Sequence, residues 1–259
     1  MNVNFDFSRK NFVVVGASSG IGRQTAIELS RSGANVLAIG RNLERLDALR
    51  KSSPLSLIKH PPRIFIEQLD VTTATADEWS SALENFTSAV GRINGGVYTA
   101  GIWGLTPLNS FDTELARKIF DTSFWGAVNF VHAATRRKFA DNGASFVLMS
   151  SISGDFAGKG LFAYSAAKAA IQSAVKSFAT EIVRDKHRIN SVSPAMVQTE
   201  MMKNEIYVPS DEIISRHLLG LGKPQDVSGM ILFLLSERAN WITGQNFFVD
   251  GGYVVGSCA

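Results

Sequence analysis

The sequence predicts an α/β fold in which a doubly wound, seven-stranded parallel β-sheet is flanked by helices. Two observations predict it. Seven short apolar runs alternate along the chain with longer segments of helical periodicity, and most of these runs are continuously apolar and rich in Val, Ile and Phe. Such runs are typical of parallel strands buried on both faces, and right-handed crossovers then wind the helices around a single sheet.

The expected elements follow one another along the chain. The strands are residues 12–15, 35–39, 64–68, 96–99, 146–149, 189–192 and 246–249. The helices are residues 20–32, 43–51, 75–90, 112–138, 162–184 and 224–236. Residues 52–62 contain three prolines and are expected to form a surface loop. Residues 200–222 follow the sixth strand, and we expect them to form a lid or substrate wall, with an ordinary surface loop as the alternative.

Composition and charge favour one globular domain over residues 1–259. Hydrophobic residues make up 45% of the chain, which suits a single large core. The net charge is only +3, and the basic clusters at 136–138 and 184–188 are short, as on solvated helix ends. The chain has one cysteine, four scattered histidines without metal-ligand spacing, and no apolar run long enough to span a bilayer. We therefore expect a cytoplasmic protein with no metal, nucleic-acid or membrane partner.

A glycine-rich turn joins the first strand to the first helix. Glycines allow the backbone to turn sharply and approach a ligand, and a helix N-terminus offers free N–H groups to a pyrophosphate. The spacing is GxxxGxG, so a dinucleotide would contact Gly16, Ser18, Ser19, Gly20, Ile21 and Gly22. The same residues also fit the GxSxG elbow of hydrolases. A turn after the first strand leaves no earlier loop to supply a second oxyanion donor, so we give that alternative little weight.

Two further strand ends indicate which dinucleotide would bind. Arg41 follows the second strand, where an acidic residue would favour a ribose with free hydroxyls. A guanidinium there suits a 2′-phosphate, so we predict NADP(H), with NAD(H) less favoured. Alternatively, Arg41 pairs with Glu44. Asp70 and Val71 end the third strand, where the carboxylate could receive the adenine amino group or cap the following helix.

Tyr164 and Lys168 are the strongest candidates for chemistry. Four residues apart on a helix, they lie on one face. A nearby ammonium favours the phenolate, so Lys168 is expected to lower the pKa of Tyr164 and make it an acid/base group. The alternative is that the pair only covers a helix surface.

Many motifs in one order identify a family resemblance that covers nearly the whole chain. They are VGASSGIG (15–22), GRN (40–42), DV (70–71), TAG (99–101), SSISG (150–154), YSAAK (164–168), NSVSPAMVQTEM (190–201), GKPQDV (222–227) and WITGQNFFVDGG (241–252). The chain resembles the short-chain dehydrogenase/reductase family. This resemblance implies one Rossmann-type domain that transfers a hydride between nicotinamide and a ketone or secondary alcohol.

The resemblance also assigns roles to individual residues. Tyr164 would be the acid/base, Lys168 would hold the nicotinamide ribose, and Ser151 would orient the substrate carbonyl. Ala100 and Gly101 would allow the cofactor to approach closely. Pro194, Val197 and Thr199 would lie where relatives hold the nicotinamide carboxamide.

Three departures separate this chain from the family pattern. Tyr98-Thr99 replaces the first two residues of the usual NNAG, Ala195 replaces the glycine after Pro194, and Ser123 stands where an Asn usually helps to seat a relay water. A Ser hydroxyl could hold water with a different geometry. These departures motivate a second hypothesis, a regulatory or scaffold protein that binds the cofactor with reduced or lost turnover. The intact Ser151, Tyr164 and Lys168 argue against it.

The substrate and the assembly are expected only in outline. A small or medium ketone, or a 3-oxoacyl thioester on a carrier protein, would suit the apolar side chains that flank the site in sequence; ordinary core packing is the alternative for each. These side chains are Trp103, Phe156, Phe162, Met196, Met201 and Met202. By analogy with relatives, we expect a homotetramer or homodimer built on the helices near 112–138 and 162–184, with a second contact at 247–255.

Overall fold

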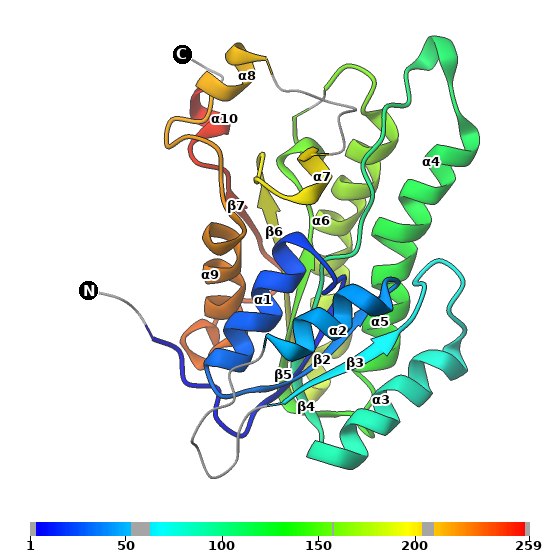
Figure 1. The fold of residues 1–259 in the computed structure, drawn as a ribbon, viewed down its shortest axis with the longest axis vertical. Helices are drawn as coiled ribbons and strands as arrows, with labels where there is room; N and C mark the ends of the chain where they lie inside the picture. Colours follow the sequence, from blue (N-terminus) through cyan, green and yellow to red (C-terminus); the bar gives the residue numbers. More distant parts are fainter. Residues whose placement is uncertain (1–3, 53–62, 157, 204–209, 257–259) are drawn as a thin grey trace.

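A single parallel sheet organises the chain. The computed structural model describes residues 4–52, 63–156, 158–203 and 210–256. Seven strands pair in the order β3-β2-β1-β4-β5-β6-β7, and every pair is parallel (Figure 1). The strands are β1 Asn11–Val15, β2 Asn35–Gly40, β3 Ile64–Gln68, β4 Ile93–Tyr98, β5 Ala140–Met149, β6 Arg188–Pro194 and β7 Asn246–Val249. The chain moves outward from β1 to β3 and then returns to β4, so the order reverses between β1 and β4, where ligands bind in such sheets.

Helices cover both faces of this sheet. The longer ones are α1 Gly20–Arg31, α2 Leu43–Lys51, α3 Ala76–Val90, α4 Thr113–Phe120, α5 Gly126–Ala134, α6 Phe162–Ile182 and α9 Pro224–Leu235. The apolar side chains form two main clusters, one with α3, α5 and α6 and the other with α1, α2 and α9. Val13 and Val14, adjacent on β1, belong to different clusters. This explains why the strands are continuously apolar, because each successive residue enters a core.

The fold class and every expected strand and long helix are confirmed, with three boundaries corrected. The helix expected over 112–138 is α4 and α5 joined by the π-helical turn η2 Asp121–Trp125, and it ends at Ala134. The strand expected from 146 begins at Ala140, because Ala140 pairs with Ile93 of β4 ahead of an irregularity in register. The strand expected over 96–99 begins at Ile93. Polar and glycine residues obscured both strand starts.

The segment 200–222 contains short helices beyond the carboxyl ends of the strands. These are α7 Glu200–Lys203 and α8 Asp211–Ser215, and α10 Tyr253–Gly256 lies near α8 in Figure 1. The N–H of Leu219 donates to the carbonyl of Gly251 at 3.0 Å, so this segment is joined to the chain that follows β7. The loop expected over 52–62 lies almost entirely outside the described residues. Within the described part of the chain, no helix is long and apolar enough to cross a membrane.

Candidate active site

The turn between β1 and α1 is packed against the end of β4. Gly16 has φ +84°, and a Cβ atom there would lie 2.7 Å from the backbone nitrogen of Ala100. A Cβ atom on Gly22 would overlap the carbonyl oxygen of Gly16 and the hydroxyl of Thr99. Only glycine fits at these two positions. The expected glycine turn therefore forms, and its backbone is held close to the Ala100-Gly101 segment.

A carboxylate of the chain itself, that of Glu200, contacts the N-terminus of α1. Ser19 is the N-cap residue, but its side chain makes no capping hydrogen bond. Instead, the N–H of Gly20 donates to Oε2 of Glu200 at 3.2 Å, and Thr199 lies beside Gly20. A carboxylate at this point stands in for the phosphate oxygens of a dinucleotide, because a helix N-terminus carries free donors and a positive dipole end. The residues present thus fit a pyrophosphate. No sequence signal linked Glu200 to this turn.

Ser18, Arg41 and Asp70 meet beyond the ends of β1, β2 and β3. A Cβ atom on Gly40 would lie 3.4 Å from the Ser18 hydroxyl, and Nη1 of Arg41 lies 4.0 Å from Oδ2 of Asp70. Partial burial works to raise the pKa of Asp70, but the N–H and hydroxyl of Thr72, together with Arg41, outweigh it and hold the pKa below its usual value. The ion-pair partner of Arg41 is therefore Asp70 rather than Glu44.

Asp70 does not cap the helix that follows it. Thr75 is the N-cap residue of α3 and forms a capping box with Glu78. Asp70 instead accepts the N–H of Thr72 at 2.9 Å and its hydroxyl at 2.7 Å. The neighbouring Val71 is buried against Gly126. The structure therefore removes the capping alternative and leaves the adenine role as a prediction.

Ser151, Tyr164, Lys168 and Ser123 lie close together, and Lys168 and Ser123 border Gly101. The Ser151 and Tyr164 side chains share a hydrogen bond. Nζ of Lys168 lies 5.6 Å from the centroid of the Tyr164 ring and donates to the carbonyl of Met149 at 3.0 Å. A Cβ atom on Gly101 would lie 3.3 Å from Nζ of Lys168 and 3.4 Å from Oγ of Ser123. The four expected catalytic side chains thus form one cluster, next to the glycine turn.

The electrostatics of this cluster differ from the expectation. Burial raises the pKa of Tyr164, and the hydrogen bond with Ser151 only partly opposes it. Burial also lowers the pKa of Lys168 to about 8. The expectation that Lys168 brings down the pKa of Tyr164 is wrong for the protein alone, because burial of Tyr164 raises that pKa.

Two of the departures from the family pattern are connected in space. The hydroxyl of Tyr98 donates to the carbonyl of Thr122 at 2.5 Å, directly before Ser123 in the π-helical turn. A Cβ atom on Gly126 would overlap that Tyr98 hydroxyl. Thr99 donates to the carbonyl of Val15 at 2.7 Å, which joins β4 to β1. The Ser123 hydroxyl is buried and has no hydrogen-bond partner among the described residues, so it is available to water or a ligand.

The loop after β6 closes the other side of the cluster. Pro194 and Val197 are buried, and Val197 pairs with Gly222 in a parallel bridge. The N–H of Met196 donates to Nε2 of His217 at 3.3 Å, a contact that the sequence did not reveal. Pro194, Val197 and Thr199 therefore lie on one stretch of backbone that reaches from β6 to the start of α1.

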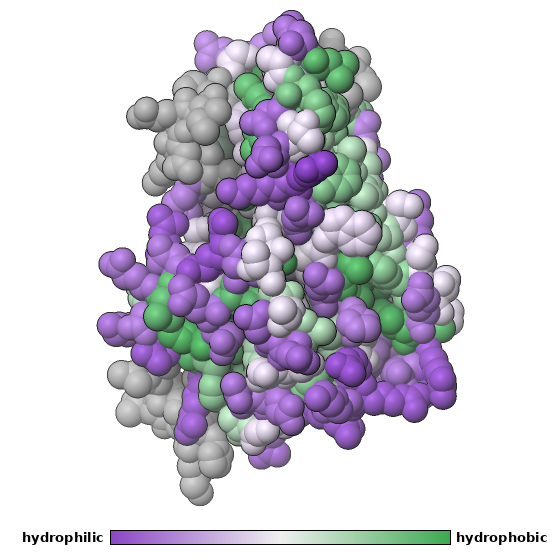
Figure 2. Space-filling view, turned by 90° about the vertical axis from the view of Figure 1, so that its right-hand side faces the viewer, coloured by the Kyte–Doolittle hydropathy of each residue, from purple (hydrophilic) through white to green (hydrophobic). Residues whose placement is uncertain are grey.

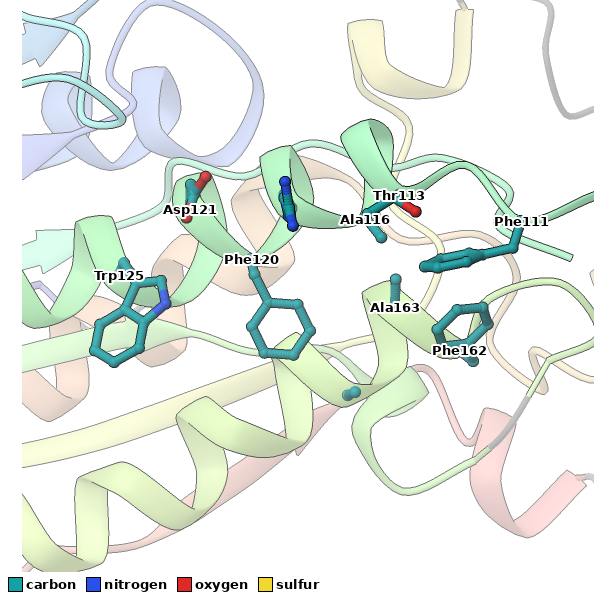
Figure 3. A pocket seen from close by; sticks show the side chains of 10 residues that line it. Phe111, Thr113, Ala116, Phe120, Asp121, Trp125, Phe162 and Ala163 are labelled. Carbon is teal, nitrogen blue, oxygen red and sulfur yellow. The ribbon is translucent and has the colours of Figure 1, made fainter. Parts of the chain in front are cut away.

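An apolar pocket lies between α4 and α6, formed in part by Ala163, the residue before Tyr164 (Figure 3). It has a volume of about 310 Å³. Phe111 and Phe162 face each other across one end, with ring centroids 5.3 Å apart, and Trp125 lies at the other. Phe162, expected in the substrate wall, lines this pocket, whose lining includes none of Ser123, Ser151, Tyr164 and Lys168; its role towards the substrate stays a prediction. Phe156 is 39% exposed, and the side chain of Met201 lies outside the described residues.

Comparison with known proteins decides the family. A family model described as enoyl-(acyl carrier protein) reductase matches residues 16–254. A short-chain type dehydrogenase/reductase from Mycobacterium ulcerans superposes with a TM-score of 0.87 at 30% identity, covering 97% of this chain and 92% of that one. The chain belongs to the short-chain dehydrogenase/reductase family. As a member of this family, it is an oxidoreductase that acts on CH–OH or C=O groups with a nicotinamide cofactor.

Relatives within the family differ in substrate. The 3-oxoacyl-[acyl-carrier-protein] reductase FabG of Thermotoga maritima is 30% identical over 244 residues, covering 94% of this chain and 97% of the relative. L-rhamnose 1-dehydrogenase (NAD(P)(+)) of a Sphingomonas strain is 31% identical over 252 residues, covering 95% and 96%. One acts on an acyl thioester and the other on a sugar, so membership of this short-chain family fixes the chemistry and leaves the substrate open.

Proposed function

We propose that this protein is an NADP(H)-dependent carbonyl reductase or alcohol dehydrogenase in which Tyr164 is the general acid/base. The observation that carries the proposal is that Tyr164 lies beside both Ser151 and Lys168, and that the Lys168 ammonium borders Gly101 near the glycine turn. In the reductive direction Tyr164 protonates the carbonyl oxygen, and Ser151 donates to the same oxygen as negative charge develops on it. The bound nicotinamide supplies or accepts the hydride.

Lys168 has two tasks in this proposal. Its ammonium is held 3.0 Å from the carbonyl of Met149, which fixes its position beside Gly101. From there it binds the nicotinamide ribose and, with the positive ring of an oxidised cofactor, favours the phenolate of Tyr164. The Ser123 hydroxyl, which lies beside the same glycine, would hold a water that returns protons to the pair.

NADP(H) is proposed over NAD(H) because of the charge at the end of β2. The side chain of Arg41 is 54% exposed, and among the described residues it forms an ion pair with one carboxylate, that of Asp70, at 4.0 Å. The Ser18 hydroxyl lies beside Gly40, the residue before Arg41. A guanidinium and a hydroxyl at that point suit a 2′-phosphate. The remaining cofactor contacts proposed are those of the glycine turn, Asp70, Val71, Ala100, Gly101, Pro194, Val197 and Thr199.

A ketone or secondary alcohol is the substrate class that we propose, and within it a 3-oxoacyl thioester, free or held on a carrier protein, is our first candidate. The relative from Thermotoga maritima and the apolar residues Trp103, Met196 and Met202 near the site in sequence support it. We also propose a single domain over 1–259 with 200–222 as the substrate loop, a cytoplasmic location, and a homotetramer or homodimer.

The test is Tyr164→Phe. Turnover of a panel of ketones, alcohols and 3-oxoacyl thioesters is followed by nicotinamide absorbance, and cofactor binding by fluorescence. We expect turnover to fall by at least about 100-fold while cofactor affinity is retained, because only the proton donor is lost. Near-full activity in Tyr164→Phe would refute the mechanism. Cofactor binding by the wild type with no turnover on any substrate would favour the regulatory alternative.

A further inference from the structure

Gln172 continues the stripe of active-site residues on α6. It lies four residues after Lys168 and eight after Tyr164, so all three face the same side of the helix. Unlike those two, it has no place in the proposed chemistry. Its amide nitrogen nevertheless reaches three acceptors on two separate segments, the turn after β5 and strand β6.

The three acceptors surround the catalytic serine. Nε2 of Gln172 donates to the carbonyl of Ser151 at 3.3 Å and to Oδ2 of Asp155 at 2.7 Å, at the two ends of the short helical turn η3 Ile152–Gly154. It also lies 3.2 Å from Oγ of Ser193 on β6. The Ser193 hydroxyl in turn donates to Oδ1 of Asn246 on β7 at 2.8 Å. One side chain thus joins the serine turn to α6 and to the end of the sheet.

The serine turn is shaped to receive this amide. A Cβ atom on Gly154 would lie only 2.7 Å from Nε2 of Gln172 and 2.9 Å from the backbone nitrogen of Ala169. The turn can approach α6 closely because this residue is glycine. On the other flank, the Ser150 hydroxyl donates to the carbonyl of Lys168 at 2.8 Å. Ser151 is therefore held to α6 from both sides, by Ser150 before it and by Gln172 after it.

We propose that Gln172 is a positioning residue that fixes the Ser151 turn against α6, so that the Ser151 hydroxyl stays within reach of Tyr164 and the substrate oxygen. This inference rests on the proposed function of Ser151. A hydrogen-bond donor to a developing oxyanion must be placed to within a few tenths of an ångström, and a displacement of about 1 Å can reduce the rate about 100-fold. In this proposal the Gln172 amide fixes the distance between the Ser151 turn and α6.

Without this amide, each of its three acceptors still has another hydrogen-bond partner or contact with water. The carbonyl of Ser151 also accepts the N–H of Gly154 at 3.0 Å, the Ser193 hydroxyl retains Asn246, and Asp155 is exposed to water. Gln172→Met keeps the length of the side chain and removes its amide, including the Nε2 donors that make the three contacts. It is therefore expected to fold with little loss of stability, which makes it suitable for testing a positioning role.

The experiment compares Gln172→Met with the wild type in full-length protein. We expect kcat to fall about 10- to 100-fold while the dissociation constant for NADPH stays within twofold, because the cofactor turn is untouched. In the cofactor-free protein, amide hydrogen exchange of residues 151–156 should become faster, since the turn has lost a support. The matched control is Gln24→Met, which removes an amide bonded to Glu28 at 2.6 Å on α1. It should leave kcat and the exchange of 151–156 unchanged.

A second variant tests the pairing itself. Gln172→Glu places a carboxylate against Asp155 and against the Ser151 carbonyl, so its turnover should be lower than that of Gln172→Met. Adding Asp155→Asn restores a donor between the two side chains and should recover part of the loss. Equal turnover in Gln172→Glu with and without Asp155→Asn would overturn the proposal.

Two other results would also overturn it. One is unchanged kcat and exchange in Gln172→Met. The other is a parallel loss of thermal stability and NADPH affinity, which indicates a purely structural role. If the wild type turns over no substrate, the proposed function fails, while the exchange measurement still tests whether Gln172 holds the turn.

Discussion

Arg41 is the residue on which the proposed preference for NADP(H) over NAD(H) rests. Its guanidinium lies at the end of β2 with Asp70 4.0 Å away, so it is positioned without being neutralised by a tight ion pair. Arg41→Ala should weaken NADPH binding by about 10- to 100-fold, the amount expected for charge-assisted hydrogen bonds to a phosphate. NADH binding should be unchanged, because NADH carries no 2′-phosphate for Arg41 to bind.

Titration of both cofactors by fluorescence checks this prediction. Arg50→Ala is the control, because Arg50 pairs with Asp47 at the far end of α2 and carries the same charge. It should shift neither cofactor. Equal weakening of NADPH and NADH by Arg41→Ala would exclude the 2′-phosphate role.

His187 is a single buried residue that should make the free energy of unfolding depend on pH. It is 3% exposed and lies edge-on against Phe146, with ring centroids 5.9 Å apart. Burial lowers the pKa of His187, and Asp185 only partly opposes this. The unfolded chain, with a His pKa of about 6.5, then binds a proton that the folded chain rejects, so this contribution to stability is present above about pH 6.5 and is lost as the pH falls below it.

Denaturant unfolding at several pH values tests this contribution. The free energy of unfolding should decrease between about pH 7 and pH 5, and His187→Leu should reduce that decrease. His132 is exposed, so His132→Leu should leave the pH dependence unchanged. The same slope in His187→Leu and in the wild type would exclude this residue as its source.

At the scale of single elements, local patterns predicted most of the fold. The bounds of α2, β3 and β7 agree with the expectation to the residue, since each is limited by turn-forming or capping residues such as Asn42. The π-helical turn at Asp121–Trp125 was not predicted, and within it the carbonyl of Thr122 accepts the hydroxyl of Tyr98 from a distant strand. Hydrophobic periodicity reports only on neighbours in sequence and does not reveal such a contact across the core.

The same limit explains what was missed in the site. Ser151, Tyr164 and Lys168 could be predicted from the sequence because they lie in the segments SSISG and YSAAK, which match the family pattern. Glu200 and Gln172 could not, since their contacts join residues far apart in the chain, at Gly20, Ser151 and Ser193. The pKa of Tyr164 was predicted with the wrong sign, because the sequence shows that a lysine is near but does not show how deeply both groups are buried.

At the scale of the whole molecule, one side of the protein exposes apolar side chains that do not pack against the sheet. Figure 2 faces the side on which α4 lies, and apolar side chains form a band among the polar ones. Phe111, Trp125 and Phe162 around the α4–α6 pocket are 48%, 54% and 41% exposed. Monomeric proteins rarely leave such a patch open to water. On a second surface, Phe248 and Val255 lie 46% and 65% exposed near the C-terminus.

The assembly prediction follows from these two surfaces. If the α4–α6 face pairs with a second copy of this chain, Trp125→Glu should halve the mass measured by light scattering, because a charge buried in an interface without a partner is strongly unfavourable. If the β7 end forms another contact, Phe248→Glu should halve the mass of a tetramer independently, and both changes together should give a monomer. Leu43→Glu alters an equally exposed side chain, at 48%, on α2 and should leave the mass unchanged. A monomeric wild type would exclude both contacts, and a full-sized assembly in Trp125→Glu would exclude the α4–α6 face.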